Sequence, residues 1–547
     1  MKLPFLSPLR QSPLLRFVPR NARKIAIIGA DGERYGRNFR ALNPSCHISV
    51  HTDISQFEAS CFLEHEPGVF DCILMQKTEL PQLEAFLTSV HSFLLPDGIV
   101  TLCVDNPLHL AQLKEGADGD PHEKRKILKK IASQASQFRS DVRDKIGGAG
   151  FHIDCLLSAA ISDEVFARWQ KEQGVDGLHA GDGLQSLWSF IRTPFFHYRL
   201  TMREFSKIHF HANILKPVGG VNDVRIHEPM EALASLPGVT VKVAEEARLS
   251  SNLTGVNKVF LWHRPVLTWK KSLPTIQALR SAGYLIVTEF DDHYSPWPSI
   301  AENQFLSFAG VHAVQTTKPE LATLFSKFNP EVAVFPNQMS EVMPRKPSEN
   351  SEQTRIFFGA LNRQSDWKDL IGPLNKALKT ARGDFCFEVV FDKEFYDALE
   401  TRHKHFTPQC PYGLYKSKLL EADISLMPLL SNEFNQMKSD LKFVEAAGCG
   451  AIPVASDVVY GKCDPSDEFS ITCKTPEAYA DAIISLINDP SRRAAMQKKA
   501  REYVKSSRLL CHHVGARYAW YQDLLNRRVE LDQALERRLD ILKLGAR

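Results

Sequence analysis

The sequence KIAIIG (Lys24–Gly29) is a short apolar run that ends in glycine, and two further runs of this kind follow it. They are IHFHANILKPVGG (Ile208–Gly220) and RIFFG (Arg355–Gly359). After each of the three, short apolar runs alternate with longer amphipathic stretches. The later apolar runs are Cys72–Met75, Ile99–Val104, Val259–Trp262, Leu285–Phe290, Val332–Phe335, Glu388–Phe391, Ile424–Leu426 and Ile452–Ala455. Continuous apolar runs are typical of strands buried on both faces, and helices between them imply parallel βαβ units. The pattern therefore predicts an α/β protein of three doubly wound domains in series.

The boundaries between these domains are visible in the composition. The stretch SEVMPRKPSENSEQT (Ser340–Thr354) is rich in proline, serine and charge, as a linker should be, and a mixed stretch at Thr193–Glu204 precedes the second glycine-terminated run. We expect Rossmann-like domains over residues 1–200, 201–340 and 341–528, followed by a helical tail over residues 529–547. The mixed charges of the tail favour a solvated helix, and a self-association surface is the alternative.

The overall composition is that of a folded globular chain, with 44% hydrophobic and 24% charged residues. The net charge of only +3 excludes intrinsic disorder and a nucleic-acid binder that works through bulk charge. The eleven cysteines include no CxxC pair, which fits reduced thiols better than disulfides or a zinc site. The stretch Phe5–Phe17 is too polar for a signal-peptide core, and no run approaches ~18 consecutive apolar residues. We therefore expect a cytoplasmic protein without a membrane span, attached at most peripherally to the inner face of the membrane.

The first domain carries a glycine turn followed by an acidic residue. Gly29 and Gly32 lie where a strand gives way to a helix, so a ligand could approach the backbone closely. Asp53 follows the next apolar run, a position from which a carboxylate can accept hydrogen bonds from ribose hydroxyls.

Two longer segments of this domain, Phe70–Pro107 and Ile146–Leu156, resemble class I S-adenosylmethionine-dependent methyltransferases. The resemblance covers residues 20–165 and implies S-adenosylmethionine as a cofactor, bound by Gly29, Gly32 and Asp53. The first strand-turn, IIGADG, departs from the acidic residue and tight G-x-G-x-G of that family. A methyltransferase-like fold without a working cofactor site, which serves as a partner surface, is therefore the alternative.

The second and third domains contain several motifs in a fixed order. They are Gly219-Gly220, Asp291-Asp292-His293, VFPN (Val334–Asn337), Gly359 with Arg363 and Lys368, and KSDLKFVEAAGCGAIPVAS (Lys438–Ser456). The ordered set resembles the GT-B glycosyltransferases over residues 205–528, specifically the large retaining group called family four. The resemblance implies a GT-B pair with an inter-domain cleft and a retaining hexosyltransferase that uses a nucleotide-diphosphate sugar.

The chemistry of such a donor explains the basic residues. Negative charge grows on the leaving phosphates as the glycosidic bond breaks, and Arg363 and Lys368 can neutralise it in the transition state. These cations can replace a divalent metal, and the donor side has no Asp-x-Asp pair, so we expect no metal. By resemblance, Asp291 and His293 face the reacting sugar. The residues implied in donor binding are Gly219, Gly220, Gly359, Asn337, Lys438, Lys442 and Glu445.

Plainer interpretations exist for some of these residues. Asp291 and Asp292 also fit a helix N-cap pair, with Asp292 the better candidate for a cap alone. Lys438 and Lys442 lie four residues apart and also fit a solvated helix face. The earlier of the two glutamates usual in the family is replaced by Met437, which weakens the case for activity.

The main hypothesis is a glycosyltransferase that transfers a sugar to a glycan or lipid-linked acceptor in surface polysaccharide or lipopolysaccharide synthesis. Its first domain is methyltransferase-like. One alternative is an S-adenosylmethionine-dependent methyltransferase whose GT-B pair serves as a glycan-binding scaffold. The other alternative is a non-enzymatic assembly protein, which Met437 and the irregular first glycine turn suggest.

Overall fold

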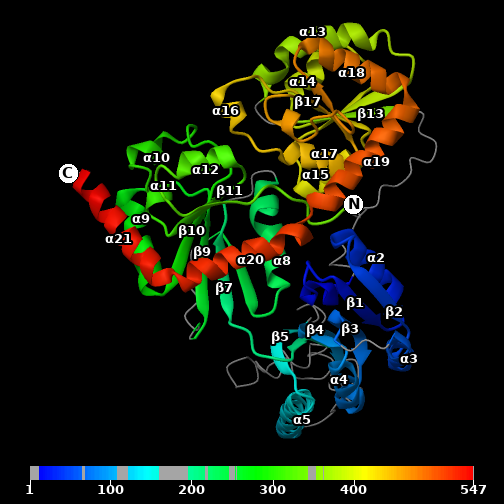
Figure 1. Cartoon of the computed structure of the whole chain (residues 1–547), viewed down its shortest axis with the longest axis vertical. Coiled ribbons are helices and arrows are strands. Elements are labelled where there is room, and N and C mark those ends of the chain that lie inside the picture. The colour runs from blue at the N-terminus through cyan, green and yellow to red at the C-terminus, as the bar shows by residue number, and fades with distance from the viewer. Residues whose placement is uncertain are drawn as a thin grey trace.

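The computed structural model describes residues 12–64, 68–106, 121–158, 195–215, 220–245, 253, 255–342, 353–360 and 363–545. It contains three six-stranded sheets, one for each predicted domain (Figure 1). Helices cover both faces of each sheet. Each sheet therefore has two separate apolar cores, one on each face. The predicted α/β class with three Rossmann-like domains is confirmed.

The first sheet has the strand order β2-β1-β3-β4-β6-β5. Its strands are β1 (Lys24–Ile28), β2 (His47–His51), β3 (Phe70–Thr78), β4 (Leu94–Asp105), β5 (His152–Ser158) and β6 (Phe195–Thr201). The helices of this domain are η1 (Pro13–Phe17), α2 (Gly32–Leu42), α3 (Ile54–Glu64), η2 (Leu80–Gln82), α4 (Leu83–His91) and α5 (Pro121–Gly148). Strand β6 runs antiparallel to both β4 and β5, whereas parallel units were expected throughout. An apolar run indicates burial on both faces but carries no information on strand direction.

The second sheet is parallel throughout, in the order β12-β11-β10-β9-β7-β8. Its strands are β7 (Ile208–Asn213), β8 (Val239–Ala244), β9 (Asn257–His263), β10 (Tyr284–Glu289), β11 (Ala313–Thr316) and β12 (Val332–Val334). The helices of this domain are η4 (Asp223–His227), α8 (Glu228–Ala234), α9 (Trp269–Ser281), α10 (Pro298–Glu302), α11 (Leu306–Ala309) and α12 (Pro319–Phe325).

The third sheet is also parallel, and its order β15-β14-β13-β16-β17-β18 is that of a dinucleotide-binding fold. Its strands are β13 (Thr354–Gly359), β14 (Phe385–Val390), β15 (Lys404–Thr407), β16 (Ile424–Met427), β17 (Ile452–Ser456) and β18 (Ile471–Cys473). The helices are α13 (Gln364–Leu378), α14 (Lys393–Ala398), α15 (Tyr412–Leu420), α16 (Glu433–Gln436), α17 (Leu441–Cys449), η5 (Tyr460–Lys462), α18 (Pro476–Asn488) and α19 (Pro490–Ser507).

The chain then returns to the second domain through α20 (Leu510–Asn526). At the crossing point the Met339 amide donates to the Arg508 carbonyl, and the Leu510 amide donates to the Met339 carbonyl. Helix α20 packs beside α8, with Tyr521 buried in the core of the second domain (Figure 1). Two facing α/β domains joined by a returning C-terminal helix are the GT-B arrangement that the resemblance predicts.

The tail forms the last helix, α21 (Arg528–Gly545), which lies along the second domain (Figure 1). Leu531, Leu535 and Leu539 recur every four residues and are each at most 3% exposed. They pack into the two cores of the second domain. The tail is therefore an amphipathic core helix, and the solvated interpretation favoured by its charges is wrong for this face.

The first domain is anchored to the second by a buried ion pair. Arg199 on β6 bonds Asp154 on β5 at 2.5 Å, and both side chains are nearly inaccessible to solvent. Each partner also bonds the second domain, because Arg199 donates to the Ala234 carbonyl and Asp154 accepts from the Gly238 amide, both at 2.9 Å. The buried side chains of this pair therefore have hydrogen-bond partners in both domains.

None of the helices in the described part of the chain combines the length and the apolar character that a membrane crossing requires.

Candidate active site

A pocket of about 280 Å³ lies between the second and third domains, at the carboxyl ends of strands from both sheets. In open α/β sheets this edge is where ligands bind. The second domain contributes Gly220, Val221, Arg264, Asp291 and Asp292 to its lining. The third domain contributes Arg363, Phe391, Cys410, Tyr412, Tyr415, Lys438, Ser439, Leu441, Lys442, Glu445 and Tyr460. Six residues of the predicted set therefore share one pocket: Gly220, Asp291, Arg363, Lys438, Lys442 and Glu445.

Asp291 is held by an arginine that sequence reasoning missed. Arg264 directly follows β9 and donates two hydrogen bonds to the Asp291 carboxylate. They run from Nε to Oδ1 at 2.5 Å and from the terminal nitrogen to Oδ2 at 2.9 Å. Burial alone would raise the pKa of Asp291, but the charge and hydrogen bonds of Arg264 hold it well below its ordinary value. Asp291 is therefore permanently ionised at neutral pH and cannot donate a proton.

Arg264 has an unusual backbone, with φ of 46° in the left-handed region. This conformation is costly for a residue with a long side chain, and such residues cluster at functional sites. The available signal in the sequence was an arginine placed directly after the buried strand NKVFLWH.

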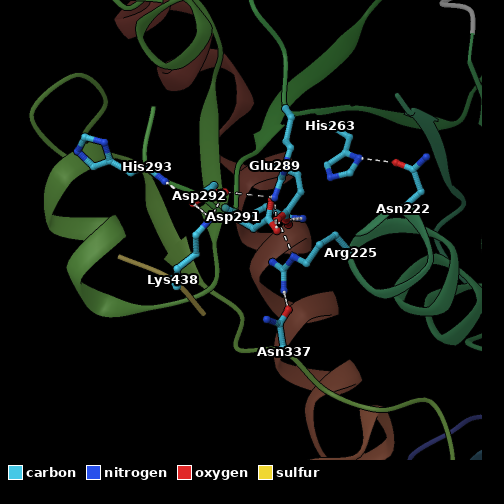
Figure 2. A network of polar contacts seen from close by, with 11 residues as sticks. Asn222, Arg225, His263, Glu289, Asp291, Asp292, His293, Asn337 and Lys438 are labelled. Atoms are coloured by element: carbon cyan, nitrogen blue, oxygen red, sulfur yellow. Dashed lines mark hydrogen bonds and ion pairs between the residues drawn. The ribbon is translucent and has the colours of Figure 1, made fainter. Parts of the chain in front are cut away.

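Asp292 bridges the two domains. Lys438, in the loop before α17, places its Nζ 2.9 Å and 3.1 Å from the two carboxylate oxygens of Asp292 (Figure 2). Asp292 also accepts a hydrogen bond from the His293 amide at 3.0 Å. The expectation of a helix cap is wrong, because the next helix, α10, begins only at Pro298.

His293 is not among the residues that line the pocket. Its ring stacks on Tyr294, with 4.7 Å between centroids, and its Nδ1 accepts from the Ser295 amide. In Figure 2 the imidazole lies apart from the Asp292–Lys438 pair. The strand exit brings Asp291 and Asp292 to the site, while the turn that follows directs His293 elsewhere.

The donor-side wall carries Arg363, Lys438 and Lys442. Arg363 donates to Asp366 and Asn435, each at 3.1 Å, and Lys442 donates to the Gly359 carbonyl. Burial first, and then the neighbouring charge of Arg363, lower the pKa of Lys442 to about 8. An anionic ligand beside this buried ammonium would offset both effects.

Lys368 is exposed and does not line the pocket. It lies on α13 next to Trp367, whose indole is buried and donates to Asp392 at 3.0 Å. Since successive helical residues are turned by about 100° from each other, burying Trp367 turns Lys368 toward solvent. The pairing of Arg363 with Lys368 at the donor phosphates is therefore wrong in its second member.

Glu445 lies in α17 and is 4% exposed. The Tyr412 hydroxyl donates to its Oε1 at 2.5 Å. Burial raises the pKa of Glu445 to about 7, and Tyr412 and Lys442 only partly offset that effect. The pocket thus contains a carboxyl group that titrates near neutral pH.

Aromatic rings leave no room for a Cβ at the two described glycines of the donor set. A Cβ on Gly220 would collide with the Tyr412 ring of the other domain, and a Cβ on Gly359 would collide with Phe357 and Tyr415. Gly220 lines the pocket, whereas Gly359 reaches it only through the carbonyl that binds Lys442. Gly219 lies outside the described residues.

Asn337 is buried behind the pocket and does not line it. Its side-chain oxygen accepts from Arg225 at 2.9 Å, and Arg225 also pairs with Glu289 at 2.8 Å (Figure 2). Glu289 accepts from Gln315, which in turn accepts from the Tyr521 hydroxyl of α20. Asn337 therefore belongs to an internal network that ties the returning helix to the strand leading to Asp291.

The residues predicted to bind S-adenosylmethionine contact other groups of the same domain. The side chain of Gln76 lies against the α-carbon of Gly29, and its Oε1 accepts from the Asp31 amide at 2.8 Å. A Cβ on Gly32 would collide with Val50. Asp53 accepts from the Gln56 amide at 2.9 Å, at the start of α3. Gln76 and Val50 therefore occupy the space against the two glycines, whereas Asp53 is exposed. Within the described residues there is also no group of three or more His, Cys, Asp or Glu side chains that could hold a metal ion.

A comparison with protein-family models finds no match, and a comparison with curated protein sequences finds none either. Among solved structures, S. aureus TarM is similar at 11% identity, with 49% of this chain and 55% of TarM covered and a TM-score of 0.38. A glycosyltransferase from Rickettsia africae is 13% identical over 58% of this chain and 99% of its own length, with a TM-score of 0.42. Anabaena HepE in complex with UDP-glucose is 15% identical over 58% of this chain and all of its own length, with a TM-score of 0.41. This chain thus spans about half of TarM, and it covers nearly the whole length of the other two structures.

Proposed function

We propose that the protein is a glycosyltransferase that moves a hexose from a nucleotide-diphosphate sugar to a glycan or lipid-linked acceptor. The single observation that supports this best is the pocket between two facing α/β domains, where Arg363, Lys438 and Lys442 line one side and Asp291 and Asp292 the other. The proposed setting is surface polysaccharide or lipopolysaccharide assembly, and the proposed outcome is retention of anomeric configuration. Both follow from the resemblance of residues 205–528.

The donor-side cations supply what the leaving diphosphate needs. Charge on the departing phosphates is greatest in the transition state, so fixed cations in a partly buried site stabilise that state more than the bound donor. Arg363 is oriented in advance by Asp366 and Asn435, and Lys442 by the Gly359 carbonyl. They need little reorganisation when the bond breaks.

Glu445 and its neighbours would bind the nucleoside. A buried carboxyl group is a strong acceptor for paired ribose hydroxyls, and the rings of Tyr412, Tyr415 and Phe391 border the same pocket. On the acceptor side, the Arg264–Asp291 pair is a rigid ionic element beside the reacting sugar.

For the first domain we propose a structural role as a partner surface of the second domain. The buried Arg199–Asp154 pair supports this role, since each of its members bonds the second domain directly.

The test is a screen of the purified protein with UDP-, GDP- and ADP-sugars. Nuclear magnetic resonance detects release of free nucleoside diphosphate and the configuration of the transferred sugar. We expect release with at least one donor class and none from an Arg363→Ala variant. Absence of turnover and of binding with every donor class would contradict the proposal.

A further inference from the structure

The cross-domain pair of Asp292 and Lys438 differs from every other ionic contact of the described pocket lining. Asp291 is paired within its own domain by Arg264, Arg363 pairs within its own domain with Asp366, and Glu445 bonds Tyr412 of the same domain. Within this lining, only Lys438 forms an ion pair with a carboxylate of the opposite domain. Separation of the domains would therefore break this contact and leave the others in place.

Lys438 also lies with the cations that would bind the donor diphosphate. Its half-buried ammonium shares the pocket wall with Arg363 and Lys442, and burial together with Arg363 and Arg264 outweighs Asp292 and lowers the pKa of Lys438. Burial therefore disfavours the charged form of Lys438 even with Asp292 in place.

We infer that Asp292 is a built-in competitor of the donor diphosphate: its carboxylate pairs with Lys438 until the phosphates bind and replace it. This inference rests on the proposed function and deepens it. The carboxylate carries one negative charge, whereas a diphosphate carries more and can also reach Arg363 and Lys442, so the exchange is favourable once the donor enters. Displacement separates the Asp292 carboxylate from Lys438 and leaves it beside Asp291 with Arg264, whose terminal nitrogen lies 3.9 Å away.

A second contact holds the same loop in the competing position. Lys318 of the second domain donates to the Gln436 carbonyl at 2.7 Å and to the Lys438 carbonyl at 3.4 Å. Farther from the pocket, Glu320 pairs with Lys462 across the domains at 3.2 Å. Charged side chains therefore join the two domains at several points, and of the residues named here only Asp292 and Lys438 line the pocket.

The decisive variant is Asp292→Asn, which keeps the shape and removes the charge. Calorimetric titration with UDP, GDP and ADP measures the Kd, and we expect the best-bound nucleotide to bind about fivefold more tightly to this variant than to the wild type. Turnover with the matching sugar donor should fall. Structural damage would weaken binding, so the direction of the change separates competition from misfolding.

The matched control is Lys462→Gln, which removes the cross-domain ion pair with Glu320 outside the pocket and should leave the Kd unchanged. In a Lys438→Met background, Asp292→Asn should no longer change the Kd, because the two residues act through one contact. Equal or weaker nucleotide binding by Asp292→Asn, or equal tightening in Lys462→Gln, would overturn the inference. Failure of the wild type to bind any nucleoside diphosphate would instead remove the proposed function, and this inference with it.

Discussion

The Tyr412 hydroxyl and the Glu445 carboxyl are 2.5 Å apart in the floor of the inter-domain pocket. Burial raises the pKa of this carboxyl to about 7 from an ordinary value of 4.5. Between these two pH values the folded protein keeps a proton that the unfolded chain has lost. The contribution of Glu445 to stability is therefore full at low pH and is lost as the pH rises toward 7.

A Glu445→Gln variant tests this titration. We expect the free energy of unfolding to fall less steeply with pH than in the wild type, by on the order of 1–3 kcal/mol across pH 5 to 7. Urea denaturation at several pH values measures the difference. Glu433→Gln, at an exposed position on α16, is the control and should leave the slope unchanged. Parallel pH profiles for wild type and Glu445→Gln would contradict the account.

The ion pair between Arg264 and Asp291 predicts a loss of stability when one charge is removed. Asp291→Asn leaves a partly buried guanidinium without its carboxylate, and we expect a loss of about 2 kcal/mol. Asp97→Asn removes a pair of similar length, with Arg203, that is more than half exposed, so it should change stability little. Urea denaturation of both variants at pH 7 compares them, and equal losses would show that burial of the Arg264 pair has no energetic consequence.

The tail helix offers a test of its packing on the second domain. Leu535→Ala removes a side chain with no exposure and should destabilise the protein by about 2–4 kcal/mol. Ile541 is 67% exposed on the same helix, so Ile541→Ala should be nearly neutral. If thermal unfolding shows the two variants to be equally stable, α21 is not part of the core.

The glycine turn of the first domain predicts the behaviour of S-adenosylmethionine. Because Gln76 covers Gly29 and takes the Asp31 amide, we expect no rise in melting temperature when the cofactor is added to the wild type. A nucleoside diphosphate that fits the inter-domain pocket should raise it in the same assay. A clear rise with S-adenosylmethionine would show that Gln76 moves aside and that the cofactor site is open.

The fold could be predicted from the sequence because buried parallel strands appear as continuous apolar runs. Each of the eight later runs lies on a strand and extends at most one residue beyond it. The antiparallel direction of β6 could not be read in this way, because burial does not depend on direction. The packed face of the tail was missed because charged residues surround the leucines that repeat every four positions.

The site was predictable where residues directly follow strands and less so elsewhere. Asp291 follows β10 and lies in the pocket, whereas His293, only two positions later, lies outside it. Lys368 lies outside the pocket because the helical turn of about 100° from the buried Trp367 directs it toward solvent. The pairing of Asp292 with Lys438 joins residues 146 positions apart and depends on how two domains meet, which local sequence patterns do not encode.

The central claim is that Arg363, and not Lys368, binds the diphosphate of a nucleotide-sugar donor in the inter-domain pocket. The most direct measurement is the Kd for the best of UDP, GDP and ADP, obtained by calorimetry on the wild type, Arg363→Ala and Lys368→Ala. The account predicts at least tenfold weaker binding to Arg363→Ala, from the loss of a charge-assisted contact worth about 1.5–3 kcal/mol, and wild-type affinity for Lys368→Ala. Unchanged nucleotide affinity in a correctly folded Arg363→Ala protein would contradict it.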